Sequence, residues 1–155
     1  MTEFEGRLLA GGRVAVVVSR YHERVTSRLL EGAMVACLEA GVPDADVDVL
    51  WVTGAFELGI TVSAAAHSGK YAAIVALGVV IRGETPHFEF IAGETAAALG
   101  RAATEALVPV GFGLLTCDTI EQAEARAGGV AGNKGREAAE AALRTADLIR
   151  QALEE

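Results

Sequence analysis

Four runs of apolar residues divide the chain, and each run is followed by a stretch with apolar residues at helical spacing. The longest run, residues 73–81, is continuous and rich in Val and Ile, as expected for a strand buried on both faces. The other three runs lie at residues 14–18, 48–52 and 110–115. Strands that alternate with helices are typical of βαβ units, so the pattern predicts an α/β protein with a parallel sheet.

Five helical stretches follow the strands, and their ends carry capping signals. Gly41 is expected to end the first helix as its C′ glycine. Asp118 is expected to cap the fourth helix, with Glu121 as its capping-box partner. The stretches lie at about residues 23–40, 55–67, 86–107, 119–127 and 136–154.

Residues 1–12 show little pattern and end in Ala-Gly-Gly, so they are interpreted as an N-terminal arm. Residues 13–155 are predicted to form one domain, because 155 residues suffice for a sizeable core. Hydrophobic residues make up 52% of the chain and the mean hydropathy is +0.36. These values are high for a monomer and favour burial of apolar surface between subunits.

Charge and cysteine content narrow the class of protein. The formal net charge of −8 argues against nucleic acid and membranes as partners. Two cysteines do not make a disulfide scaffold, and the three histidines lack the spacing of a metal site. The first residues lack a basic and apolar signal segment, and no apolar run would span a bilayer. The expected location is therefore the cytoplasm.

Three segments with polar or aromatic side chains fall where predicted strands end. Tyr21 and His22 follow the first strand, residues 53–57 follow the second, and residues 80–87 close the third. In parallel α/β sheets, ligands bind beyond the carboxyl ends of the strands. The three segments together therefore predict a ligand site at this edge of the sheet.

The third of these segments combines a strand end with a helix start. Thr85 and Pro86 are typical of an N-cap and a first helical residue. The amides of Gly83, Glu84 and Thr85 are then expected at a helix N-terminus, which suits a phosphate or another oxyanion.

His87 is predicted to lie in the first turn of the same helix. The positive end of the helix disfavours a protonated imidazole, which leaves a neutral base for proton transfer. Taken alone, His87 would be interpreted as a surface histidine. The adjoining strand end and oxyanion site favour the catalytic interpretation.

Five sequence motifs extend this picture. They are Gly-Ala-Phe-Glu at 54–57, Ile-Arg-Gly-Glu-Thr-Pro-His-Phe at 81–88, Leu-Thr-Cys-Asp-Thr-Ile-Glu-Gln-Ala at 115–123, Arg-Ala-Gly at 126–128 and Ala-Gly-Asn-Lys-Gly at 131–135. In this order and spacing they resemble the lumazine synthase family, over about residues 13–150. The resemblance implies a three-layer flavodoxin-like fold, a four-stranded parallel sheet of order 2-1-3-4, and an N-terminal arm added to a neighbouring subunit's sheet.

The resemblance also implies a reaction, the penultimate step of riboflavin biosynthesis. The substrates would be 5-amino-6-(D-ribitylamino)uracil and 3,4-dihydroxy-2-butanone 4-phosphate. The products would be 6,7-dimethyl-8-ribityllumazine, phosphate and water, and no metal or organic cofactor is implied. The implied assembly is a pentamer with active sites between subunits, built into an icosahedral shell, with riboflavin synthase as a partner.

Residue roles follow from the same resemblance. His87 matches the proton-transfer histidine, and Arg126 matches a bidentate arginine that binds the phosphate together with Gly83, Glu84 and Thr85. The residues that match the remaining substrate contacts are Tyr21, His22, Ala55, Phe56, Glu57, Val80 and Ile81, with Phe112 and Lys134 offered by a neighbouring subunit.

Most of these side chains have a plain structural alternative. Tyr21 is also typical of a half-buried aromatic residue, and Glu57 of a carboxylate at a helix start. Arg126 would suit a helix end, Phe112 a core position, and Lys134 a solvated loop. Their joint spacing favours the functional interpretation.

The chain departs from the family pattern at a few positions. Tyr21 and His22 stand where Phe-Asn is common, which leaves the contact from position 22 open. Thr53 and Gly59 replace common prolines, and Val130 replaces a frequent lysine. None of these changes removes a group that the reaction needs.

Other functions remain open at this point. One alternative is a flavin- or lumazine-binding module without turnover, and another is a structural protein whose role is to form a shell. The intact His87, Arg126 and Lys134 favour the enzyme over both. A flavodoxin-like electron carrier is disfavoured, because residues 19–22 do not form a phosphate-binding loop.

Overall fold

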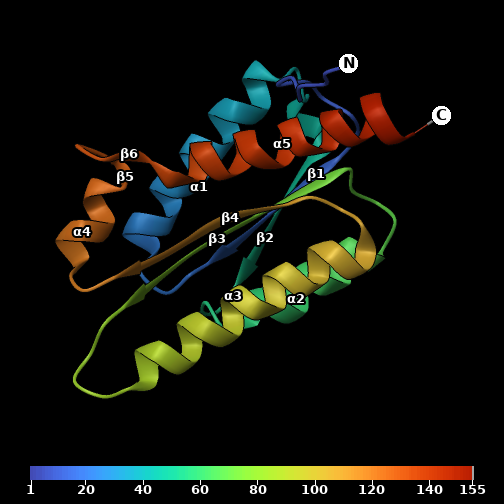
Figure 1. The fold of residues 1–155 in the computed structure, drawn as a ribbon. Helices are drawn as coiled ribbons and strands as arrows, with labels where there is room; N and C mark the ends of the chain where they lie inside the picture. The colour runs from blue at the N-terminus through green and yellow to red at the C-terminus, as the bar shows by residue number, and fades with distance from the viewer. Residues whose placement is uncertain (155) are drawn as a thin grey trace.

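A four-stranded parallel sheet lies between two layers of helices in the computed structural model, which describes residues 1–154 (Figure 1). The strand order β2-β1-β3-β4 confirms the predicted order. Glu155, which ends the predicted domain, lies outside the described residues. The strands are β1 (Val14–Ser19), β2 (Val47–Val52), β3 (Ala73–Ile81) and β4 (Val110–Cys117).

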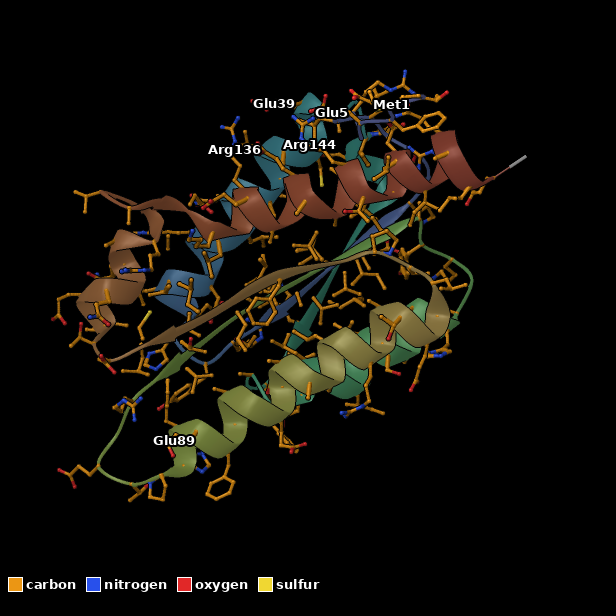
Figure 2. All side chains as sticks on the ribbon, in the orientation of Figure 1. Met1, Glu5, Glu39, Glu89, Arg136 and Arg144 are labelled. Atoms are coloured by element: carbon orange, nitrogen blue, oxygen red, sulfur yellow. The ribbon has the colours of Figure 1, made fainter. Side chains whose placement is uncertain are left out.

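The helices divide between the two faces of the sheet. On one face lie α1 (Glu23–Glu39) and α5 (Lys134–Leu153), and on the other lie α2 (Glu57–His67) and α3 (His87–Ala106) (Figure 1). Arg136 of α5 pairs with Glu39 of α1 at 2.9 Å, and Figure 2 labels both residues on the outer side of this layer. The shorter elements are η1 (Asp44–Asp46), α4 (Ile120–Ala125), β5 (Ala127–Gly129) and β6 (Gly132–Asn133).

The two central strands form the core because both of their faces are covered. All six residues of β1 are buried. Val16 packs in the cluster beneath α1 and α5, whereas Val17 packs in the cluster beneath α2 and α3. This explains why the apolar runs of β1 and β3 are continuous rather than alternating.

Glycine allows α5 to approach the edge strand closely. A side chain at Gly111 of β4 would collide with the backbone carbonyl of Ala138. A side chain at Gly135 would likewise collide with the backbone of Leu29 in α1. Gly41 follows α1 with a φ of +83°, as expected for a C′ glycine.

Two predicted helix starts are wrong by one residue. Thr119, not Asp118, caps α4, because its hydroxyl accepts the amide hydrogen of Gln122 at 3.2 Å. Gln122, not Glu121, closes the box by accepting the Asp118 amide at 2.8 Å. Similarly, α3 begins at His87, with Pro86 at the cap position.

The segment expected as a loop before the last helix forms a small hairpin. Strands β5 and β6 pair antiparallel, and α5 begins at Lys134 rather than at residue 136. Asn133 caps α5, since its side-chain oxygen accepts the amide hydrogens of Gly135 and Arg136. The hairpin therefore fixes the start of the last helix.

The N-terminal arm runs along the helices of its own chain. The Arg7 amide donates to the Asp147 carboxylate at 2.8 Å, and Gln151 donates to the Glu5 carbonyl at 2.9 Å. Figure 2 labels Met1, Glu5 and Arg144 close together over α5. Addition of the arm to a neighbouring sheet stays a prediction. Within residues 1–154, no helix has the length and apolar character that a membrane span requires.

Candidate active site

A cavity of about 580 Å³ opens at the carboxyl ends of β1, β2 and β3. All three segments predicted from strand ends contribute to its wall. The lining residues are Tyr21, Gly54, Ala55, Phe56, Glu57, Val79, Val80, Ile81, Gly83, Thr85, His87, Phe88 and Ile91. A single chain thus brings most of the predicted site residues together in the wall of one cavity.

The pairing of β1 with β2 places Tyr21 beside residues 53–57. The Tyr21 amide donates to the Thr53 carbonyl at 3.0 Å, just beyond the last paired residues of the two strands. The Tyr21 side chain is 67% exposed and contacts the His22 ring edge-on, with 4.3 Å between ring centroids. An accessible aromatic face at the cavity is suited to stacking on a planar ligand.

Glu57 shapes the turn between β2 and α2. The Gly54 amide donates to Glu57 Oε1 at 2.9 Å, and the Glu57 amide donates to the Gly54 carbonyl at 3.2 Å. This reciprocal pair holds the turn at the start of α2. The Oε2 atom of Glu57 has no hydrogen-bond partner within residues 1–154, so it is available to a hydroxyl group in the cavity.

The third wall comes from the end of β3 and the start of α3. Val80 and Ile81 close the strand, and Gly83 and Thr85 line the cavity from the connecting loop. His87 is the first residue of α3, and its imidazole is exposed and forms no hydrogen bond with residues 1–154. The ring nitrogens are therefore free to exchange protons with a ligand.

Three apolar residues of the cavity wall were not predicted from the sequence. Val79, Phe88 and Ile91 line the cavity but were not among the predicted site residues. The spacing of residues 88 and 91 is that of one helical face, so a signal was present for α3. Which face of α3 meets the sheet is decided only by packing.

His22 does not line this cavity. Its backbone is left-handed, with φ 60°, and its side chain lines a second cavity of about 450 Å³ at the junction of α1 and α4. Burial lowers the pKa of His22. Histidine and asparagine are both among the residues that adopt this conformation most readily, so the backbone at position 22 accommodates either.

Glu84, Phe112, Arg126 and Lys134 also lie outside the cavity wall. Arg126 and Lys134 flank hairpin β5–β6, and their backbones are joined because the Lys134 amide donates to the Arg126 carbonyl at 2.8 Å. The Arg126 guanidinium donates to the Gln122 carbonyl at 3.0 Å. Phe112 lies on edge strand β4 and is 54% exposed. Phe112, Arg126 and Lys134 therefore do not line the cavity to which His87 of the same chain belongs.

Arg126, which directly precedes β5, acts electrostatically on Cys117 at the end of β4. Burial raises the pKa of the Cys117 thiol, and the positive charge of Arg126 opposes this shift. Cys117 pairs in register with Ile81, a residue of the cavity wall. Arg126 thus lies at the same carboxyl edge of the sheet as the cavity.

The fold and the cavity define an α/β protein of the flavodoxin-like type, with a cavity at the strand ends, where ligands bind in such sheets. A family model described as 6,7-dimethyl-8-ribityllumazine synthase matches residues 11–150. The chain belongs to this family.

Two relatives carry the same description. One, from Gemmatimonas aurantiaca, is 54% identical over 154 residues, which cover 99% of this chain and 94% of the relative. Another, from a species of Anaeromyxobacter, is 49% identical over 153 residues, which cover 98% of this chain and 94% of the relative. Both are named 6,7-dimethyl-8-ribityllumazine synthase.

Proposed function

We propose that this protein condenses 5-amino-6-(D-ribitylamino)uracil with 3,4-dihydroxy-2-butanone 4-phosphate to give 6,7-dimethyl-8-ribityllumazine, phosphate and water. Membership of the family supports the reaction. The structural observation that carries it is the single cavity that unites Tyr21, Glu57 and His87. These three side chains offer a stacking face, a hydroxyl acceptor and a proton carrier.

The proposed chemistry has three steps. The amino group of the pyrimidine attacks the ketone of the butanone phosphate, and water leaves as the imine forms. Phosphate is then eliminated, and ring closure onto the remaining carbonyl carbon releases a second molecule of water. His87 takes and returns the protons, and the Gly83 to Thr85 segment receives the phosphate. Holding both substrates in one cavity supplies much of the acceleration.

The pyrimidine substrate fits the opposite wall of the cavity. Tyr21 stacks on the ring, and Phe56 packs beside it. Glu57 accepts a hydrogen bond from the ribityl chain with its free oxygen. The backbone of Val80 and Ile81 contacts the ring edge. No metal or organic cofactor enters this scheme, so turnover should persist in a metal chelator.

We assign Phe112, Arg126 and Lys134 to the cavity of a neighbouring subunit. The support is their position outside their own cavity wall, together with the hydrogen bond that holds Arg126 and Lys134 side by side. A neighbour that brings Arg126 to the phosphate would complete the site. Head-to-tail contacts of this kind close into a ring, and we propose a pentamer.

Further assembly is part of the same proposal. Exposed apolar side chains such as Ile60, Phe90 and Phe112 supply surface for subunit contacts. The arm, residues 1–12, would add to a neighbouring sheet edge, and pentamers would join into an icosahedral shell that associates with riboflavin synthase in the cytoplasm. Light scattering or mass photometry tests the assembly: a fully active monomer would overturn the shared site, and a stable lone pentamer only the shell.

The reaction is tested by mixing the two substrates with the protein and recording lumazine fluorescence. Inorganic phosphate should compete with the butanone phosphate and not with the pyrimidine. Binding of lumazine without turnover would favour the non-catalytic module instead. Shells that neither bind nor turn over would favour a purely structural role.

A further inference from the structure

Arg82 lies between two residues of the cavity wall, yet its own side chain is not part of that wall. Ile81 and Gly83 line the cavity on either side of it. The Arg82 guanidinium donates to Asp118 Oδ1 from Nε at 2.9 Å and to Glu89 Oε1 from Nη1 at 3.3 Å. It also lies over the Phe88 ring, 4.6 Å from the ring centroid.

These contacts join parts of the protein that are far apart in the sequence. Asp118 lies between β4 and α4, where its amide is held by Gln122. Phe88 and Glu89 belong to the first turn of α3, directly after His87, and Figure 2 shows Glu89 at this end of the helix. One guanidinium thus connects the end of β4 to the turn that carries His87.

The loop between β3 and α3 has few other ties. Residues 83–87 are all exposed. Within residues 1–154, their one side-chain hydrogen bond is local, from the His87 amide to the Thr85 hydroxyl at 3.4 Å. The Arg82 amide, which donates to the Cys117 carbonyl at 2.9 Å, marks the last ladder bond before the loop. The hydrogen bonds that attach this loop to the end of β4 and to the Glu89 side chain are therefore those of Arg82.

We propose that Arg82 is a positioning residue that holds His87 and the phosphate-binding loop in place. The inference deepens the proposed function and rests on it. Arginine suits the task because its planar fork reaches two carboxylates while its face lies on an aromatic ring. A lysine offers a single point charge, so it would keep a contact with one carboxylate but would not bridge both carboxylates while lying on the ring.

The test compares Arg82→Met and Arg82→Lys with Arg28→Met. Arg28 is an exposed arginine on α1 whose side chain forms no ion pair within residues 1–154, so it controls for the lost charge. Displacement of reacting groups by about 1 Å costs up to about 100-fold in rate. We expect Arg82→Met to lower kcat by about 10- to 100-fold, Arg82→Lys to restore part of the loss, and Arg28→Met to stay within about twofold of wild type.

A purely structural role of Arg82 would affect binding of the butanone phosphate and of the lumazine product alike. A positioning role should affect mainly the butanone phosphate. Arg82→Met should raise KM for the butanone phosphate, whereas affinity for the lumazine product, bound mainly through the Tyr21 wall, should stay within about twofold. Melting temperature should change little, because the ion pairs are exposed. The proposal would be overturned if lumazine affinity fell as far as KM for the butanone phosphate rose and the melting temperature also fell.

Variants of the partners separate positioning from direct phosphate binding. Glu89→Gln and Asp118→Asn leave Arg82 intact but remove its anchors, so each should lower kcat if Arg82 positions the loop. If both retain wild-type kcat while Arg82→Met raises only KM for the phosphate substrate, Arg82 is a ligand and positioning is wrong. Hydrogen exchange of residues 83–90, faster in Arg82→Met, tests the anchoring without turnover. A wild-type protein that makes no lumazine would defeat the proposed function, while unchanged exchange would defeat this inference.

Discussion

The amino and carboxyl ends of the sheet differ in whether their polar side chains are paired within the chain. At the amino end, charges are paired within the chain: Arg13 contacts Asp48 at 2.7 Å, and the Tyr71 hydroxyl donates to the same carboxylate at 2.7 Å. At the carboxyl end, Tyr21 and His87 are exposed, and their side chains form no hydrogen bond within residues 1–154. The amino end thus pairs these polar groups within one chain, whereas the carboxyl end leaves Tyr21 and His87 open at the cavity.

Buried charge shows the same contrast. Asp147 of α5 is buried and receives hydrogen bonds from Arg7 and Gln151, which fasten the arm. At the other end, the side chains of Arg126 and Lys134 form hydrogen bonds within residues 1–154 only with Gln122 and Glu137, which are close in sequence. A buried carboxylate needs partners in its own fold, whereas an exposed cation such as Lys134 is stabilised by water.

Removal of His87 is the largest expected effect on the carboxyl end. His87→Ala should lower kcat by about 10²–10⁴-fold, because it removes the proton carrier from the cavity wall. His67→Ala is the matched control, since His67 is an exposed histidine at the end of α2. Steady-state kinetics and thermal melting distinguish lost chemistry from lost folding. An unchanged kcat in His87→Ala would contradict the assigned role.

Mixing inactive variants sharpens the claim that the site is shared. His87→Ala and Arg126→Ala should each be impaired alone. In mixed rings each site takes His87 from one subunit and Arg126 from the next, so equal amounts should restore about a quarter of wild-type activity, half times half. A mixture of His87→Ala with Glu57→Ala, which lie in one wall, should restore none. No recovery in the first mixture would place Arg126 in its own chain's site.

The arm contact at the amino end should depend on pH. Hydrogen bonds from the Arg7 side chain and amide hold the pKa of Asp147 well below its ordinary value. A lowered pKa contributes stability above the unfolded pKa of about 4, and that contribution is lost as the pH falls further. Asp147→Asn should therefore lower the melting temperature at pH 7, with a difference that shrinks below about pH 4.

Asp44→Asn provides the control for this pH dependence. Asp44 is exposed and its side chain forms no hydrogen bond within residues 1–154. Its melting temperature should follow that of wild type at every pH. A constant difference between Asp147→Asn and wild type from pH 7 down to pH 2 would show that the carboxylate charge is not the cause.

The smallest expected effect concerns Leu107, which directly follows the last residue of α3 and lies near the amino end of the sheet. Its backbone is left-handed, with φ 55°, and its side chain is 83% exposed. Glycine adopts this conformation freely, so Leu107→Gly should raise the free energy of unfolding by up to about 1 kcal/mol. Leu38→Gly, at an exposed position within α1, should lower it by about 1 kcal/mol. Chemical denaturation measures both, and a loss of stability at Leu107 would contradict the argument.

Local patterns in the sequence predicted most of the fold. The continuous apolar run at residues 73–81 matches β3. The cavity lies at the carboxyl ends of the strands, as predicted. The hairpin β5–β6 was missed because strands of three and two residues carry no periodic signal. The cap of α4 was misplaced because adjacent Asp118 and Thr119 are both good capping residues, and backbone geometry chooses between them.

The amino-acid sequence by itself determined the strands, the helices and the chemistry of the side chains at the strand ends, because these depend on residue type and short-range spacing. The tertiary structure decided which of those groups meet. It joined Tyr21, Glu57 and His87 in one cavity, turned His22 towards another, and linked Arg82 to Asp118. Such contacts depend on how helices pack on the sheet, which is set by the shapes of many side chains together and by no single stretch of the chain.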